Sequence, residues 1–170
     1  MEIRQETRTD YPAVFELNRQ VFGKENEPRL VEALRKSKAF VPELSLVAEE
    51  DNQIVGYILF SKITIHGEKQ HESLAVGPVA VKPELQRKGI GKMLMQTGIR
   101  KATDLGFDSI LVLGSKDYYS RFGFKSAGDW QIATEYNDPD STMILELRPG
   151  VLTNVSGIAE YPPEFAENNC

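Results

Sequence analysis

The sequence predicts an α/β domain with a mixed, mostly antiparallel sheet, and three observations support this fold class. Three strand-like segments, 44–48, 54–65 and 74–81, are separated by short polar turns, which favour antiparallel hairpins. The hydrophobic period then changes to that of a helix over 90–105. A short, wholly apolar segment follows at 110–113. A strand, a crossover helix and a buried strand in this order predict two neighbouring parallel strands.

Composition and charge exclude several classes of protein. The length of 170 residues fits one domain. A net charge of −5 is not that of a general nucleic-acid binder, and no apolar run approaches the ~20 residues of a membrane span. Met1 is not followed by a secretory leader, and the single cysteine, Cys170, allows no internal disulfide. We therefore expect a cytoplasmic protein without a nucleic-acid or membrane partner.

The N-terminal part predicts one strand and two helices before the strand block. Residues 3–6 alternate apolar and polar side chains, as in a half-buried strand. Thr9 or Asp10 then offers an N-cap for a helix that ends at Gly23. A second helix follows over 27–36, with its apolar side chains at helical spacing.

The C-terminal part predicts a short helix, a hairpin and a tail. The helix covers 118–122 and closes on a glycine, and the segments 130–136 and 142–147 alternate as the two strands of a final hairpin. We expect the domain to cover 1–148. The tail, 149–170, is too short for a core of its own and too apolar to be free, so it should pack on this domain or on a neighbouring subunit, as in a homodimer.

Two local features constrain the strand block. Pro78 lies inside the third strand, and because proline cannot donate to a ladder, a bulge or a locally unpaired stretch is expected there. His66 and His71 lie in a polar hairpin-like stretch without partner cysteines. We therefore expect two surface histidines and no metal site.

The loop between the third strand and the long helix carries the chemistry. The segment reads Val79-Ala80-Val81-Lys82-Pro83-Glu84-Leu85-Gln86-Arg87-Lys88-Gly89-Ile90-Gly91-Lys92. The first amides of a helix lack internal partners, and two glycines allow a ligand close to the backbone. Three nearby cations complete an anion site suited to a phosphate or pyrophosphate. The alternative, a helix start with solvated lysines, is equally compatible with these features.

Two familiar phosphate-binding motifs do not match this loop. A Walker A loop needs a glycine where Gln86 stands and a serine or threonine where Met93 stands. A dinucleotide-binding fingerprint needs a third glycine at the position of Leu94 and an early first strand in a doubly wound sheet. Neither condition is met.

The residues Gln86-Arg87-Lys88-Gly89-Ile90-Gly91 resemble the Gln/Arg-x-x-Gly-x-Gly/Ala signature of the GCN5-related N-acetyltransferases, the GNAT superfamily. A second family motif, aromatic-Tyr-x-x-x-Gly-Phe, resembles residues 118–124. The resemblance covers about residues 1–148, and the tail is similar to that of a subgroup of small bacterial acetyltransferases whose substrates are generally unassigned. It implies a single domain with helices on both faces of a sheet that is splayed at the cofactor site.

The resemblance also implies the ligand and the residues that hold it. The ligand would be acetyl-CoA, a co-substrate whose pyrophosphate binds the loop amides. Val79 and Val81 would offer backbone groups to the pantetheine arm, and the amide near Val81 would face the thioester oxygen. The cofactor-binding residues expected from this resemblance are Val79, Ala80, Val81, Gln86, Arg87, Lys88, Gly89, Ile90, Gly91, Lys92 and Ser115.

Tyr119 corresponds to the general acid of the family, where a phenol protonates the departing thiolate. A purely structural role, as an aromatic ring under the short helix, is the alternative. Ser115 has two interpretations as well, a pantetheine contact or a helix N-cap. Ala75 stands where some relatives carry a glutamate base, so the base would be another carboxylate, a water relay or solvent.

These expectations lead to an acetyl-CoA-dependent N-acetyltransferase that acts on a primary amine, by direct attack within a ternary complex. The acceptor would be a small molecule or a peptide. An acyl-CoA-binding or sensing module on the same fold is the main alternative, because Ala75 replaces the base. A phosphate-ligand binder of unrelated fold is a third, against which the second motif argues.

Overall fold

The computed structural model describes all 170 residues and divides the chain into two units. The first unit consists of Met1–Ser61, Gly77–Lys101 and Pro162–Cys170, and the second of Lys62–Val76 and Ala102–Tyr161. Two long strands therefore contribute residues to both units. No helix combines the length and the apolar composition that crossing a membrane requires.

Four strands form the sheet of the first unit, in the order β1-β2-β3-β4. Their bounds are β1 Glu2–Gln5, β2 Phe40–Glu50, β3 Gln53–His66 and β4 Gln70–Val81. The pairs β1–β2 and β2–β3 are antiparallel, and the β2–β3 turn is tight because Asp51 and Asn52 both adopt positive φ. This confirms the predicted first strand and the first of the predicted hairpins.

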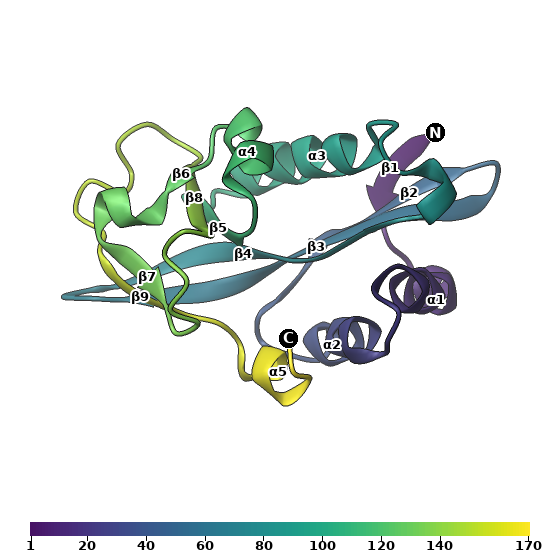
Figure 1. The fold of residues 1–170 in the computed structure, drawn as a ribbon, viewed down its shortest axis with the longest axis horizontal. Helices are drawn as coiled ribbons and strands as arrows, with labels where there is room; N and C mark the ends of the chain where they lie inside the picture. Colours follow the sequence, from purple (N-terminus) through teal and green to yellow (C-terminus); the bar gives the residue numbers. More distant parts are fainter. The chain divides into compact units, whose positions relative to one another are not determined.

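Helices cover both faces of the sheet in the first unit. Figure 1 shows α1 and α2 on one face and α3 on the other. The bounds are η1 Arg8–Asp10, α1 Tyr11–Phe22, α2 Asn26–Arg35, η2 Pro83–Leu85, α3 Ile90–Asp104 and α5 Pro163–Glu167. Gly23 ends α1 in the left-handed conformation, as predicted, whereas α2 begins one residue earlier than expected, with Glu25 at the N-cap position.

A buried polar network joins the N-terminal elements of this unit. The guanidinium of Arg35 donates to both carboxylate oxygens of Glu6, at 3.0 and 2.9 Å, and lies over the ring of Tyr11. Ser45 Oγ donates to Glu6 and shares a hydrogen bond of 2.7 Å with the hydroxyl of Tyr57. Buried charges of this kind are tolerated because each one is paired and hydrogen-bonded.

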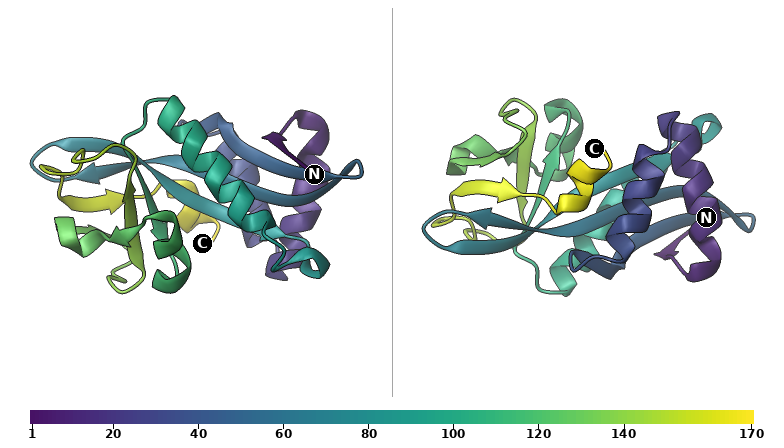
Figure 2. Two further views of the ribbon diagram at one scale, coloured as in Figure 1. Left: turned by 90° about the horizontal axis from the view of Figure 1, so that it is seen from above. Right: turned by 90° about the horizontal axis from the view of Figure 1, so that it is seen from below.

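Two glycines allow α3 to lie directly against β3. A Cβ atom at Gly98 of α3 would lie 2.1 Å from Cε1 of Phe60, and one at Gly56 of β3 would lie 2.9 Å from Cγ2 of Ile90. Neither position has room for a side chain unless its neighbour moves. The helix crosses the strands diagonally in the left panel of Figure 2. This close contact holds the N-terminus of α3, and hence the loop that precedes it, against the sheet.

The second unit is built on the other parts of β3 and β4. Its further elements are β5 Ser109–Leu113, α4 Lys116–Tyr119, η3 Ser120–Phe122, β6 Lys125–Ser126, η4 Ala127–Trp130, β7 Ile132–Thr134, β8 Thr142–Glu146 and β9 Gly157–Glu160. The strand order is β4-β5-β8-β6, with β9 beside β3 and β7 beside β9. The pair β4–β5 is parallel, as the sequence predicts, and β5–β8 is antiparallel.

The predicted hairpin of 130–136 with 142–147 is wrong. Trp130 belongs to η4, and Gln131 adopts a left-handed conformation that ends it. Only Ile132–Thr134 is extended, and it pairs in parallel with β9. The second predicted strand exists as β8, but its partners are β5 and β6. The alternation therefore predicts extended chain correctly but does not identify the partner strand.

Candidate active site

The loop between β4 and α3 holds its shape through a few internal hydrogen bonds. The amide of Leu85 donates to the carbonyl of Lys82 at 2.8 Å, and Nε2 of Gln86 donates to the carbonyl of Val81 at 3.1 Å. Arg87 then adopts a left-handed φ of +64° and Gly89 a φ of +89°. A Cβ on Gly89 would meet nothing within 4 Å, so this glycine is required by backbone conformation and not by space.

The main chain of this loop presents a run of unpaired donors. The first intrahelical bond joins the amide of Met93 to the carbonyl of Gly89, at 3.0 Å. The six amides of residues 87–92 have no acceptor within the chain. They lie at the positive end of the α3 dipole, where an anion is stabilised. The geometry therefore favours the anion site over a plain helix start.

Cationic side chains surround these amides. Arg87, Lys88 and Lys92 are exposed, and none of them forms a salt bridge, so their charges are not neutralised by the protein. In a chain of net charge −5 this is a local concentration of positive charge. Exposed cations attract an anion over distance but are screened by salt, so they add less affinity than the amides do.

The strand that leads into the loop has a free edge. The β4–β5 ladder consists of the pairs Leu74↔Ile110 and Ala75↔Leu111 and ends there. On its β5 side, β4 is therefore unpaired at Pro78, in keeping with the prediction, although the strand itself runs on without interruption to Val81. In the first unit, the side chain of Ala80 is buried while those of Val79 and Val81 are half-buried.

Tyr119 lies in the second unit, in a cluster of aromatic rings at the end of α4. Its ring makes edge contacts with Tyr118 and Phe124, at centroid distances of 4.9 and 5.6 Å, and a tilted contact with Phe122 at 6.4 Å. Burial, with a smaller contribution from Tyr118, raises the pKa of Tyr119 to about 12. The phenol is therefore protonated at neutral pH, and its hydroxyl has no hydrogen-bond partner within the chain.

Ser115 is the N-cap of α4. Its hydroxyl oxygen accepts a hydrogen bond from the amide of Tyr118 at 3.4 Å, and its carbonyl accepts one from the amide of Tyr119 at 3.0 Å. The capping interpretation of this serine is thus confirmed. Its exposed side chain keeps the capacity to donate to a ligand.

The contacts of the three carboxylates considered as a base do not assign that role to any of them. Glu25 forms an ion pair with Arg29, and Glu27 forms one with Lys24 at 3.4 Å. Glu72 is exposed on β4. Ala75, at the position where some relatives carry a glutamate, is fully buried and is the last paired residue of β4 toward β5.

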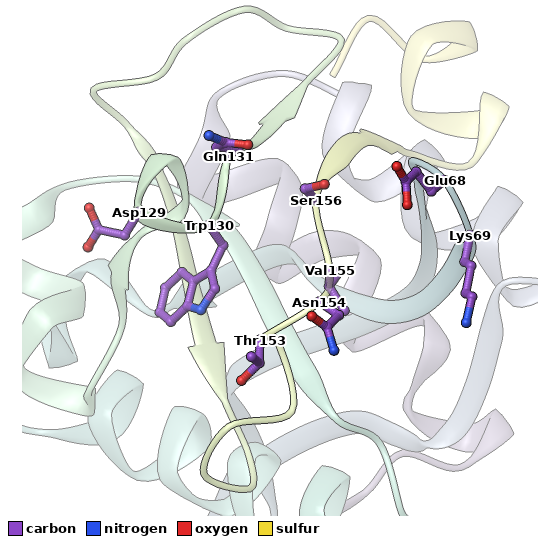
Figure 3. Close-up of a pocket in the computed structure, with 9 residues that line it drawn as sticks. All are labelled: Glu68, Lys69, Asp129, Trp130, Gln131, Thr153, Asn154, Val155 and Ser156. Carbon is purple, nitrogen blue, oxygen red and sulfur yellow. The ribbon is translucent and has the colours of Figure 1, made fainter.

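A separate cavity of about 620 Å³ lies in the second unit (Figure 3). It is lined by Glu68, Lys69, Asp129, Trp130, Gln131, Thr153, Asn154, Val155 and Ser156. None of these residues belongs to the predicted site, and its polar side chains other than the indole are exposed. Sequence reasoning gave no indication of this cavity, because it is formed by three segments that are distant along the chain.

The comparisons with known proteins agree with this geometry. The model of the acetyltransferase (GNAT) family matches residues 5–124. The uncharacterized N-acetyltransferase YhbS of Escherichia coli strain K12 is 30% identical over 167 residues, which cover 97% of this chain and 98% of that one. The uncharacterized N-acetyltransferase YjhQ of the same strain is 35% identical over 135 residues, 78% of this chain and 75% of that one.

Solved structures give the same result. The crystal structure of the GNAT family N-acetyltransferase YhbS from Escherichia coli, in complex with CoA, has a TM-score of 0.90 at 29% identity and covers 97% of this chain and 91% of that one. A GNAT family acetyltransferase from Brucella melitensis, in complex with acetyl-CoA, has a TM-score of 0.79 at 32% identity, with 96% and 97% covered. With its fold, its loop of free amides and these relatives, the chain belongs to the acetyltransferase (GNAT) family.

Proposed function

We propose that this protein transfers the acetyl group of acetyl-CoA to a primary amine, by direct attack of the amine on the thioester in a ternary complex. The observation that carries the proposal is the run of six unpaired amides, residues 87–92, at the N-terminus of α3. A pyrophosphate offers several charged oxygens to such a run, and charge-assisted hydrogen bonds are the strong ones. The relatives from Escherichia coli and Brucella melitensis, solved with CoA and acetyl-CoA, support the same ligand.

The chain that precedes these amides offers the remaining contacts with the cofactor. The free edge of β4 offers backbone groups at Val79 and Val81 for the amides of the pantetheine arm. The amide near Val81 would stabilise the negative charge that develops on the thioester oxygen. The side chains of Ala80 and Ile90 are buried, so Ile90 contributes through its main-chain amide, and the side chain of Gln86 braces the loop against Val81.

Tyr119 is the proposed general acid. As the amine nitrogen bonds to the acetyl carbon, the carbon–sulfur bond breaks, and the leaving thiolate takes the hydroxyl proton. A thiol has an ordinary pKa of about 8.5, well below the value of about 12 for this phenol. Proton transfer from Tyr119 to the sulfur is therefore uphill, which limits what the hydroxyl contributes as a general acid. Its contribution belongs at the low end of the usual range, about 100-fold.

The amine must also lose protons, and Ala75 supplies no base for this. That residue favours a second candidate function, an acyl-CoA-binding or sensing module on the same fold. Water or the solvent can remove the protons of an amine that reaches the site uncharged, so the transferase remains the better-supported proposal. A module that only binds acyl-CoA needs no general acid, so the half-buried phenol of Tyr119 argues for the transferase.

A panel screen tests the proposal. Acetyl-CoA is incubated with small amines, amino acids, polyamines, aminoglycosides and peptide N-termini, and release of the CoA thiol is measured with and without protein. We expect at least one amine to give protein-dependent thiol release together with its acetylated product. Tight binding of acetyl-CoA without product from any amine would replace the transferase by the sensing module.

A further inference from the structure

Gly114, between the end of β5 and the start of α4, occupies a position where no side chain fits. A Cβ atom built there would lie 2.3 Å from Cε2 of Tyr119, 2.9 Å from its Cδ2 and 3.4 Å from its Cζ. These distances, apart from the last, are shorter than real Cβ contacts. The overlap is with Cε2 and Cδ2, and Cε2 is bonded to Cζ, the atom that carries the hydroxyl.

The backbone of Gly114 does not explain the glycine. Its φ does not lie in the left-handed region, unlike that of Gly123, which ends η3. Its amide donates to the carbonyl of Ser141 at 2.9 Å, a bond that any residue other than proline would form. The contact with Tyr119 is therefore the feature of this position that requires the absence of a side chain.

We propose that Gly114 is a positioning residue for the hydroxyl of Tyr119, because its bare backbone forms one wall of the slot that holds the phenol ring. The hydroxyl has no hydrogen-bond partner within the chain, so packing alone sets its position. Tyr118, Phe122 and Phe124 form the aromatic contacts of the ring, and Gly114 closes its Cδ2–Cε2 edge. A methyl group at 114 moves the ring. Misplacement of a reacting group by about 1 Å can cost about 100-fold in rate.

This inference rests on the proposed role of Tyr119, and a double-mutant cycle separates the two. We expect Gly114→Ala to lower kcat by about 100-fold, the loss that a displacement of about 1 Å can cause. The affinity for acetyl-CoA should not change. In the Tyr119→Phe background the same change should lower kcat by less than about threefold, because the group that it misplaces is already gone. Gly128→Ala is the matched control, since a Cβ there meets nothing within 4 Å and its φ is ordinary. It should leave kcat and folding unchanged.

A second readout does not depend on catalysis. Displacement of the ring toward solvent should bring the pKa of Tyr119 down from about 12 toward the ordinary value near 10, measured as phenolate absorbance and assigned by its loss in Tyr119→Phe. If Tyr119→Phe has full kcat, the proposed acid is wrong, while a lowered phenol pKa in Gly114→Ala still shows that Gly114 positions the ring. An unchanged titration, or an equal loss of kcat in both backgrounds, would overturn the inference.

Discussion

The loop over 86–92 in the first unit and the surroundings of Tyr119 in the second offer different kinds of functional group. The side chains of residues 86–89 are exposed, and the donors of the loop are the main-chain amides of residues 87–92. Tyr119 is half-buried among aromatic rings and offers one hydroxyl. Binding that is spread over many backbone groups tolerates the loss of any one side chain, whereas chemistry that depends on a single atom does not.

The glycines of the two regions show the same difference. Gly89 stands at a φ of +89° with open space around its Cα, so its role is conformational. Gly114 has an ordinary backbone and a ring at 2.3 Å, so its role is to leave room. A valine at the first position would strain the main chain, and an alanine at the second would move a side chain.

The largest effect is expected from removing residues 149–170. This deletion removes β9, the partner of both β7 and the end of β3, and α5 of the first unit. It would leave the short β7 without any partner and would remove buried side chains such as Leu152. We expect loss of cooperative thermal unfolding, since a 148-residue remainder with unpaired strand edges aggregates. Proteolysis that releases the tail and leaves an equally stable core would contradict this.

Tyr119→Phe tests the role of the single hydroxyl in the second region. The ring and its aromatic contacts stay, and only the hydroxyl is lost. With an accepted amine, kcat should fall by about 100-fold, because the hydroxyl matters in the transition state and little in the ground state. The steady-state kinetics of the wild type and of Tyr118→Phe, a neighbour in the same cluster, provide the control. Full turnover in Tyr119→Phe would assign the acid role to water or another side chain.

Much of the first region is predictable from sequence, because it depends on local rules. A glycine-containing segment between a strand and an amphipathic helix predicts free amides wherever it occurs. In the second unit, by contrast, strands pair with partners from distant segments. The alternation at 130–136 could not show that residue 132 pairs with Gly157, and nothing in the local pattern showed that Gly114 faces the ring of Tyr119.

Alkaline pH tests the burial of three phenols. Burial raises the pKa of Tyr57, Tyr119 and Tyr161 above the ordinary value near 10, to about 12 for Tyr119. The folded state therefore holds these protons more tightly than the unfolded state. Their stabilisation is fully present below pH ~10 and is lost as the pH rises from there through the folded pKa values.

Phenolate absorbance against pH measures this effect. Tyr57, Tyr119 and Tyr161 should titrate only above the ordinary value near pH 10, together with unfolding. Tyr119→Phe should remove one of these three late-titrating phenols. Titration of all three near pH 10, without unfolding, would show that these phenols are not buried.

The smallest effects are expected from the loop cations. Arg87→Ala and Lys88→Ala each remove one exposed charge and no amide. The affinity for acetyl-CoA should fall by about fivefold or less, and the loss should shrink with added salt, because exposed charges are screened. A steep loss from either variant, by calorimetry at physiological salt, would mean that side chains and not the backbone hold the pyrophosphate.

The most direct measurement is calorimetric titration of acetyl-CoA into Gly91→Val and Tyr119→Phe. Gly91 lies in the first turn of α3 with an ordinary φ, so a valine fits the backbone, and we expect its side chain to occupy space that the pyrophosphate needs. Gln96→Val, at an exposed position beyond the first turn of the same helix, is the control. We predict a loss of affinity of about 100-fold in Gly91→Val, or ~2.7 kcal/mol, and of less than about threefold in Tyr119→Phe and Gln96→Val. Wild-type affinity in a folded Gly91→Val would contradict the assignment of binding to the loop backbone.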